Sequence, residues 1–156
     1  MEIKKVMVIG AGQMGGGIAQ VEAMIGRKVY LNYVNLDIVN ARIAFIEKLL
    51  SKNVAKGKMT EEQKAATLAN LIPSTDQNDA ADCDLVIEAI VEKMEIKAKV
   101  FENLDKICKP ETILASNTSS LPITEIAACT KRPEQVIGMH FMNPVPVMKL
   151  VEVIRG

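Results

Sequence analysis

The stretch VMVIGAGQMGGGIAQ, residues 6–20, decides the fold of this chain. A strand-like apolar run leads into three glycines with the spacing G-x-G-x-x-G, at Gly10, Gly12 and Gly15, and a helical pattern follows. Gly10 permits a tight turn, Gly12 lets the backbone approach a pyrophosphate, and Gly15 allows close packing of helix on strand. A plain strand-to-helix turn is the alternative, but the strand before and the helix after the glycines favour a dinucleotide cradle.

The adenosine ribose in such a cradle is usually held by an acid at the end of the second strand, about 20 residues on. In this sequence the segment is YLNYVNLD, residues 30–37, and Tyr33 occupies that position beside Asn32. The nearest carboxylate is Asp37, and no arginine directly follows the strand to accept a 2′-phosphate. NAD is favoured as the cofactor, and the choice between NAD and NADP stays open.

Apolar runs of strand length alternate with longer helical patterns, which is typical of a parallel sheet with helices on both faces. An insert at about residues 37–70 indicates a helical hairpin, whose second helix begins at the capping box TEEQ. The predicted fold class is α/β: a single domain, residues 1–156, with a doubly wound, mostly parallel, Rossmann-type sheet. We expect strands at residues 4–10, 28–33, 72–75, 84–89, 112–117, 136–141 and 149–154.

Composition argues against several classes of function. Lysine plus arginine number 19 and aspartate plus glutamate also 19, so no basic field attracts nucleic acid or an anionic membrane. No apolar run reaches the ~20 residues of a membrane span, and the charged start MEIKK does not read as a signal peptide. The three cysteines fit neither a metal site nor a disulfide framework, and we expect reduced core residues. A soluble, cytoplasmic protein with small-molecule partners and no metal is expected.

The only histidine, His140, lies in GMHFMNPVP, a pattern that predicts a strand end followed by a stiff loop. A lone histidine is more often structural than catalytic. However, Glu152 lies in the otherwise apolar KLVEVI, where an ionised carboxylate needs a partner, and His140 is the obvious candidate. A carboxylate-held imidazole can abstract an alcohol proton near neutral pH, and the alternative is a buried His–Glu bond without chemistry.

Two further polar features lie outside these motifs. The five polar residues 116–120 of LASNTSSLPITEI end a predicted strand, at the sheet edge where doubly wound folds bind ligands. Ser119 or Ser120 could instead simply cap the next helix. The hairpin has a basic tip, with Lys52 and Lys56 on it, which by itself indicates a solvated face.

Taken together, these stretches resemble the N-terminal, NAD-binding domain of the L-3-hydroxyacyl-CoA dehydrogenase family, and its bacterial 3-hydroxybutyryl-CoA dehydrogenases most closely. The resemblance covers essentially the whole chain, through VMVIGAGQMGGGIAQ, DLVIEAIVEKMEIK, ILASNTSSLPI and GMHFMNPVPVMKLVEVIRG. It implies an NAD-dependent oxidoreductase that interconverts short-chain 3-hydroxyacyl-CoA and 3-ketoacyl-CoA, such as 3-hydroxybutyryl-CoA and acetoacetyl-CoA, in either direction.

The resemblance also implies roles for individual residues. The catalytic residues would be the base His140, its orienting partner Glu152, and Ser119 and Asn143 beside the substrate oxygen and the nicotinamide. The cofactor would contact Gly10, Gly12, Gln13, Met14, Gly15, Tyr33, Glu92, Lys97, Ser119 and Asn143. The coenzyme A side of the substrate would contact Lys52, Lys56 and Ser119.

The sequence departs from the family's pattern in two places. The family usually has aspartate where Tyr33 stands, and it continues into a second, helical domain that would begin where this sequence stops, at Gly156. That domain completes the substrate pocket and forms the dimer, so a homo-oligomer or pairing with a helical domain is expected. Two alternatives stay open: an NAD-binding or assembly module without turnover, and a related hydroxy-acid dehydrogenase with a non-CoA substrate, against which the basic hairpin argues.

Overall fold

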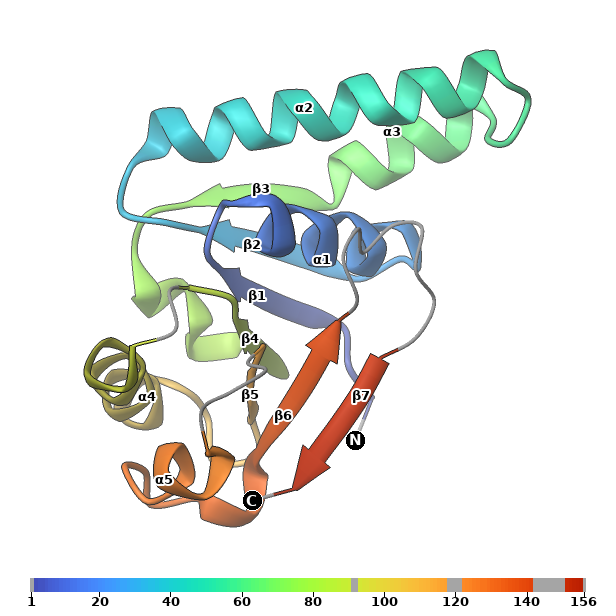
Figure 1. Ribbon diagram of the computed structural model, residues 1–156. Helices are drawn as coiled ribbons and strands as arrows, with labels where there is room; N and C mark the ends of the chain where they lie inside the picture. Colours follow the sequence, from blue (N-terminus) through green and yellow to red (C-terminus); the bar gives the residue numbers. More distant parts are fainter. Residues whose placement is uncertain (1, 91–92, 118–121, 142–150, 156) are drawn as a thin grey trace.

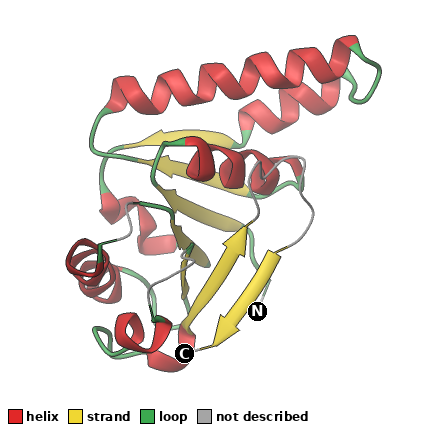
Figure 2. Ribbon diagram, in the orientation of Figure 1, coloured by secondary structure: helices red, strands yellow, loops and turns green. Residues whose placement is uncertain are grey.

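The computed structural model describes residues 2–90, 93–117, 122–141 and 151–155. These residues form a seven-stranded sheet with the order β3-β2-β1-β4-β5-β6-β7 and helices on both faces (Figures 1 and 2). The strands are β1 (Lys5–Ile9), β2 (Lys28–Asn32), β3 (Leu71–Ser74), β4 (Leu85–Glu88), β5 (Ile113–Ser116), β6 (Val136–Phe141) and β7 (Val151–Arg155). The helices are α1 (Gln13–Met24), α2 (Leu36–Ala55), α3 (Glu61–Ala69), α4 (Met94–Ile107) and α5 (Ile123–Ala127), with 3₁₀ turns η1 (Gln77–Asp82) and η2 (Pro133–Gln135).

The connections make the sheet doubly wound. Strands β1 to β6 pair in parallel, and the order reverses between β1 and β4, the place where such sheets bind ligands at the carboxyl ends of their strands. The predicted α/β class is therefore confirmed. Strand β7 is antiparallel to β6, a direction that the sequence pattern did not specify. The segment between them, residues 142–150, is shorter than the dozen or so residues that a parallel crossover needs.

Each face of the sheet has its own apolar layer, because side chains alternate along β1. Val6 and Val8 contribute to the core shared with α1, α2 and α3, whereas Met7 and Ile9 contribute to the core shared with α4 and α5. All four side chains are buried. Burial on both faces explains why the strands read as continuous apolar runs in the sequence.

The hairpin expected at about residues 37–70 is formed by α2 and α3, drawn across the top of Figure 1. Asn35 caps α2 by accepting a hydrogen bond from the Ile38 N–H at 3.2 Å. The predicted capping box begins α3: the Thr60 hydroxyl accepts from the Gln63 N–H, and the Gln63 side chain accepts from the Thr60 N–H, both at 3.0 Å. Local sequence thus determines both helix starts.

The cysteines are free thiols. Cys83 and Cys108 are buried, and burial raises the pKa of Cys83 to about 12 and that of Cys108 to about 11. Both therefore behave as inert core residues, as predicted. Cys129, which follows α5, is half-buried.

No helix among the described residues is long and apolar enough to cross a membrane. Over the same residues, no group of three or more histidine, cysteine or acidic side chains has the arrangement of a metal site.

The amino ends of β1 and β4 are joined by a carboxylate. Asp84 accepts hydrogen bonds from the backbone N–H groups of Lys4 and Lys5 at 2.8 and 3.1 Å, and from the Lys109 ammonium at 2.6 Å. The Lys109 bond first, and then the backbone bonds, lower the pKa of Asp84 from 3.8 to about 2. A carboxyl group whose pKa is lower in the folded than in the unfolded state stabilises the fold at pH values above its unfolded-state pKa. This stabilisation is lost as the pH falls through the folded-state pKa.

Asp84→Asn is therefore expected to remove part of the acid sensitivity of the fold. In the unchanged chain, the free energy of unfolding should fall between about pH 4 and pH 2. The variant should be less stable near neutral pH and lose less across that window. Urea denaturation at a series of pH values measures both effects, and Glu102→Gln, on the exposed face of α4, is the control. Equal acid dependence in Asp84→Asn and the unchanged chain would contradict this assignment.

Candidate active site

The glycine-rich turn between β1 and α1 fits a dinucleotide. Gly10 has a φ of 121°, and a Cβ on Gly15 would overlap the Gly10 carbonyl oxygen, so only glycine allows α1 to lie so close to its strand. Gly12 is exposed, and no atom lies within 4 Å of the place a Cβ would take there. The backbone at Gly12 is thus open to the close approach of a pyrophosphate.

The start of α1 adds to this fit. Gly12 is its N-cap and supplies no side-chain hydrogen bond, and the first turn contains no acidic residue. The first backbone N–H groups of α1 are therefore not capped by a side chain. They can donate to an anion at the positive end of the helix. Of the two residues after the cap, Gln13 is exposed, and Met14 is half-buried against the core under α1.

At the end of β2 the side chain in the ribose position is Tyr33. It is half-buried and packs against the core shared with α1, α2 and α3. Its neighbour Asn32 is buried and donates from Nδ2 to the Ser74 hydroxyl at 2.9 Å, so this amide is already engaged within the sheet. The Gly10 N–H donates to the Asn32 carbonyl at 2.8 Å, which fixes the glycine turn beside the end of β2.

Tyr33→Asp is expected to tighten NADH binding by about tenfold, because a carboxylate that accepts the ribose hydroxyls adds a charge-assisted bond of about 1.4 kcal/mol. Calorimetric titration of both forms measures the change. Tyr33→Phe, which keeps the ring and removes only the hydroxyl, is the control and should bind NADH nearly as the unchanged chain does. Unchanged or weaker binding by Tyr33→Asp would show that the present side chains already serve the ribose.

A buried polar cluster lies at the carboxyl ends of β4 and β5. The side chains of Glu88 and Lys97 have no exposed surface, and the Lys97 Nζ lies 2.8 Å from both carboxylate oxygens of Glu88. The buried Ser116 hydroxyl donates to Glu88 Oε1 at 2.6 Å, and the Ile90 N–H donates to Oε2 at 2.7 Å. The cluster fastens the first turn of α4 and the segment after β4 to the sheet.

Lys97, predicted as a cofactor contact, thus places its ammonium group on Glu88. Glu88 was not predicted as a site residue, whereas its partner Ser116 belongs to the polar stretch predicted at the ligand-binding edge of the sheet. The sequence did contain a signal for Glu88. This carboxylate ends the apolar run DLVIE, just as Glu152 interrupts the apolar run KLVEVI.

The backbone register places the two predicted catalytic residues together. Glu88, Ser116 and Gly138 are register partners across β4, β5 and β6, so they form one row near the carboxyl edge of the parallel strands. His140 lies two residues beyond Gly138, and its register partner in the antiparallel strand β7 is Glu152. Directly opposite residues of an antiparallel pair lie on the same face of a sheet.

Other predicted site residues fall elsewhere. Ser119, Asn143 and Glu92 lie outside the described residues. Lys52 and Lys56 are exposed at the carboxyl end of α2, the opposite end of that helix from Tyr33 (Figure 1). The structure therefore brings the glycine turn, Tyr33 and the His140–Glu152 backbone pair to the carboxyl edge of the sheet, and leaves these two lysines on the hairpin tip.

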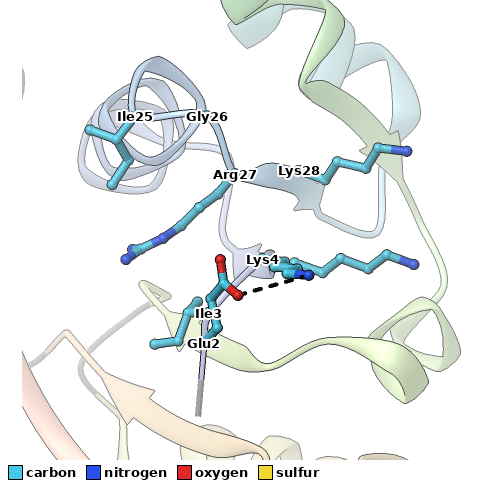
Figure 3. A pocket seen from close by; sticks show the side chains of 8 residues that line it. Glu2, Ile3, Lys4, Ile25, Gly26, Arg27 and Lys28 are labelled. Carbon is cyan, nitrogen blue, oxygen red and sulfur yellow. Dashed lines mark ion pairs between the residues drawn. The ribbon is translucent and has the colours of Figure 1, made fainter.

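A shallow pocket at the opposite edge of the sheet is a separate feature. Figure 3 shows its lining from the amino ends of β1 and β2 and the turn after α1, with Glu2 and Lys4 paired at 3.8 Å. Arg27, which also lines the pocket, is paired with Glu22. Since doubly wound sheets bind ligands at the carboxyl ends of their strands, this pocket is not part of the candidate active site.

Comparison with known proteins agrees with this geometry. Residues 5–156 match the family described as 3-hydroxyacyl-CoA dehydrogenase, NAD binding domain. The chain belongs to this family. The match indicates NAD as the cofactor, as predicted, and the residues of the glycine turn fit it. The resemblance inferred from the sequence motifs is likewise confirmed.

Individual relatives support the same assignment. The chain is 56% identical over 156 residues to a probable 3-hydroxybutyryl-CoA dehydrogenase of Bacillus subtilis, covering 100% of this chain and 54% of that protein. A solved 3-hydroxybutyryl-CoA dehydrogenase from Escherichia coli is similar with a TM-score of 0.97 at 47% identity, covering 98% of this chain and 32% of that one. The (S)-3-hydroxybutyryl-CoA dehydrogenase of Ralstonia eutropha is similar with a TM-score of 0.96 at 44% identity, covering 99% of this chain and 55% of that one. The chain thus spans about half the length of the curated relatives it matches.

Proposed function

We propose that the protein carrying this chain is an NAD-dependent dehydrogenase of short-chain 3-hydroxyacyl-CoA, interconverting 3-hydroxybutyryl-CoA and acetoacetyl-CoA in either direction. The observation that carries the proposal is the register pairing of His140 with Glu152 at the sheet edge that also holds the glycine turn. Relatives that bear the name 3-hydroxybutyryl-CoA dehydrogenase support the substrate class. In this proposal residues 1–156 act as one cofactor-binding domain.

The chemistry follows from the proposed pair. The glycine turn would hold NAD, whose nicotinamide would supply the acceptor for the hydride that leaves C3 of the hydroxyacyl group. At the same time the imidazole of His140 takes the proton of the C3 hydroxyl, so the C–H and O–H bonds break and a ketone forms. Glu152 steadies the imidazolium that results, and in the reverse direction His140 returns the proton to the oxygen.

The remaining predicted residues keep supporting roles in the proposal. Ser119 and Asn143 position the substrate oxygen and the nicotinamide. Glu92 and Lys97 serve the cofactor, and Lys97 does so while it is paired with the buried Glu88. Lys52 and Lys56 serve the phosphates of coenzyme A from the hairpin tip, where their exposed ammonium groups are free to move with the substrate. The cytoplasmic location, and a homo-oligomer or a pairing with a helical domain, stay predictions.

The test is NADH-dependent reduction of acetoacetyl-CoA, followed by NADH absorbance. The assay uses the chain alone and mixed with the second half of the Bacillus subtilis relative, and acetoacetate is the substrate control. Reduction of the thioester but not of the free acid supports the proposal. Equal use of free acetoacetate would point to a non-CoA substrate, and NADH binding without oxidation in every mixture would point to a binding module without turnover.

A further inference from the structure

Arg42 of α2 lies against the glycine-rich turn, although the sequence separates them by about thirty residues. Its Nε donates to the Ala11 carbonyl at 3.2 Å. Its aliphatic stem covers Gly16 so closely that a Cβ on that glycine would overlap the Arg42 Cδ. The guanidinium carbon also lies 5.1 Å from the centre of the Phe45 ring, within cation–π range. The arginine is thus held in one place between α2 and the first turn of α1.

The described residues use only part of the hydrogen-bond donors of the Arg42 guanidinium. It carries five N–H groups in a planar fork that suits phosphate oxygens. Only Nε has a hydrogen-bond partner among the residues that the structure describes, and within that part of the chain no carboxylate forms an ion pair with Arg42. The two terminal nitrogens are therefore available to an anionic ligand at the turn.

The position of the arginine corresponds to the adenosine end of the dinucleotide. Ala11 follows Gly10, whose N–H donates to the Asn32 carbonyl at the end of β2, the strand end where this fold holds the adenosine ribose. In this fold an acid there binds the 2′-hydroxyl of NAD, whereas an arginine nearby accommodates the 2′-phosphate of NADP. Tyr33 puts no negative charge at the strand end, and the nearest carboxylate along the chain, Asp37, is exposed in the first turn of α2.

We propose that Arg42 forms a subsite for the 2′-phosphate, so that the chain binds NADPH as well as NADH. The inference rests on the proposed dinucleotide site and extends the range of cofactors that this site accepts. A single cation with two free donors, and no acid in the ribose position to repel the phosphate, is the physical basis. The sequence pattern did not indicate this phosphate subsite, because Arg42 lies in the second turn of α2 and not directly after β2.

Fluorescence titration with NADH and NADPH tests the subsite without measuring turnover. The unchanged chain should bind the two within about threefold of each other. Arg42→Ala should weaken NADPH by about tenfold, the loss of one charge-assisted phosphate contact, and NADH by less than about twofold. Lys48→Ala removes an exposed positive charge from the same helix and should change neither affinity by more than about twofold.

A second measurement does not depend on any variant. In the unchanged chain, 2′,5′-ADP should displace NADH at least as well as ADP does. Binding of NADPH about a hundredfold weaker than NADH, or an equal loss of both dinucleotides in Arg42→Ala, would overturn the subsite while leaving the NAD site in place. Failure to bind either dinucleotide would overturn the proposed function together with it.

Discussion

His140→Gln is expected to lower the rate of acetoacetyl-CoA reduction by about 10²–10⁴-fold in the protein that carries this chain, the usual contribution of general acid–base catalysis. Glutamine retains hydrogen-bonding atoms but cannot exchange a proton near neutral pH. NADH affinity should change by less than about twofold, since His140 lies in β6, whereas the glycine turn follows β1. Initial rates and NADH titration on the same preparation measure both quantities.

The partner variant Glu152→Gln separates positioning from proton transfer. It should lower the rate less than His140→Gln, because the imidazole can still exchange the proton although no carboxylate stabilises its charged form. An activity of His140→Gln within about threefold of the parent would exclude the histidine as the proton donor and acceptor.

Lys97→Met is expected to lower the free energy of unfolding by about 3–5 kcal/mol. The Lys97 and Glu88 side chains have no exposed surface, so the variant leaves a buried carboxylate whose remaining hydrogen bonds come from neutral groups. Removing one partner of a buried ion pair is costly for this reason, whatever the pair itself contributes.

Urea denaturation followed by circular dichroism measures the loss. Lys99→Met, on the exposed surface of the same helix α4, is the matched control and should change stability by less than about 0.5 kcal/mol. The double variant Glu88→Leu and Lys97→Met should regain much of the loss, because it leaves no buried charge. Equal stability of Lys97→Met and Lys99→Met would show that the pair is not a determinant of the fold.

Local patterns in the sequence were sufficient to predict most of the fold. Each of the seven predicted strands overlaps an observed strand, because burial on both faces of the sheet leaves unbroken apolar runs. The start of α3 was equally readable, since Thr60 and Gln63 satisfy each other within a single turn. The direction of β7 could not be read from its residues, because an apolar strand has the same pattern in either orientation.

The site was only partly accessible to the same reasoning. The glycine turn was predictable because all of its determinants lie within one short segment. The cluster of Glu88, Lys97 and Ser116, and the contact of Arg42 with Ala11, join residues that only tertiary packing brings together. Periodicity says which face of a helix is buried, but it does not say which polar side chain meets which.

The proposed function requires that NADH bind at the glycine turn and that hydride transfer take place at the sheet edge where His140 is the register partner of Glu152. The decisive measurement is single-turnover transfer of deuterium to acetoacetyl-CoA from NADH that carries deuterium at both C4 positions, read by mass spectrometry of the acyl-CoA product. We expect 3-hydroxybutyryl-CoA that carries the deuterium at C3, and no labelled product with His140→Gln under conditions where NADH is still bound. Bound NADH with no transfer of label in the unchanged protein, or full transfer in His140→Gln, would contradict it.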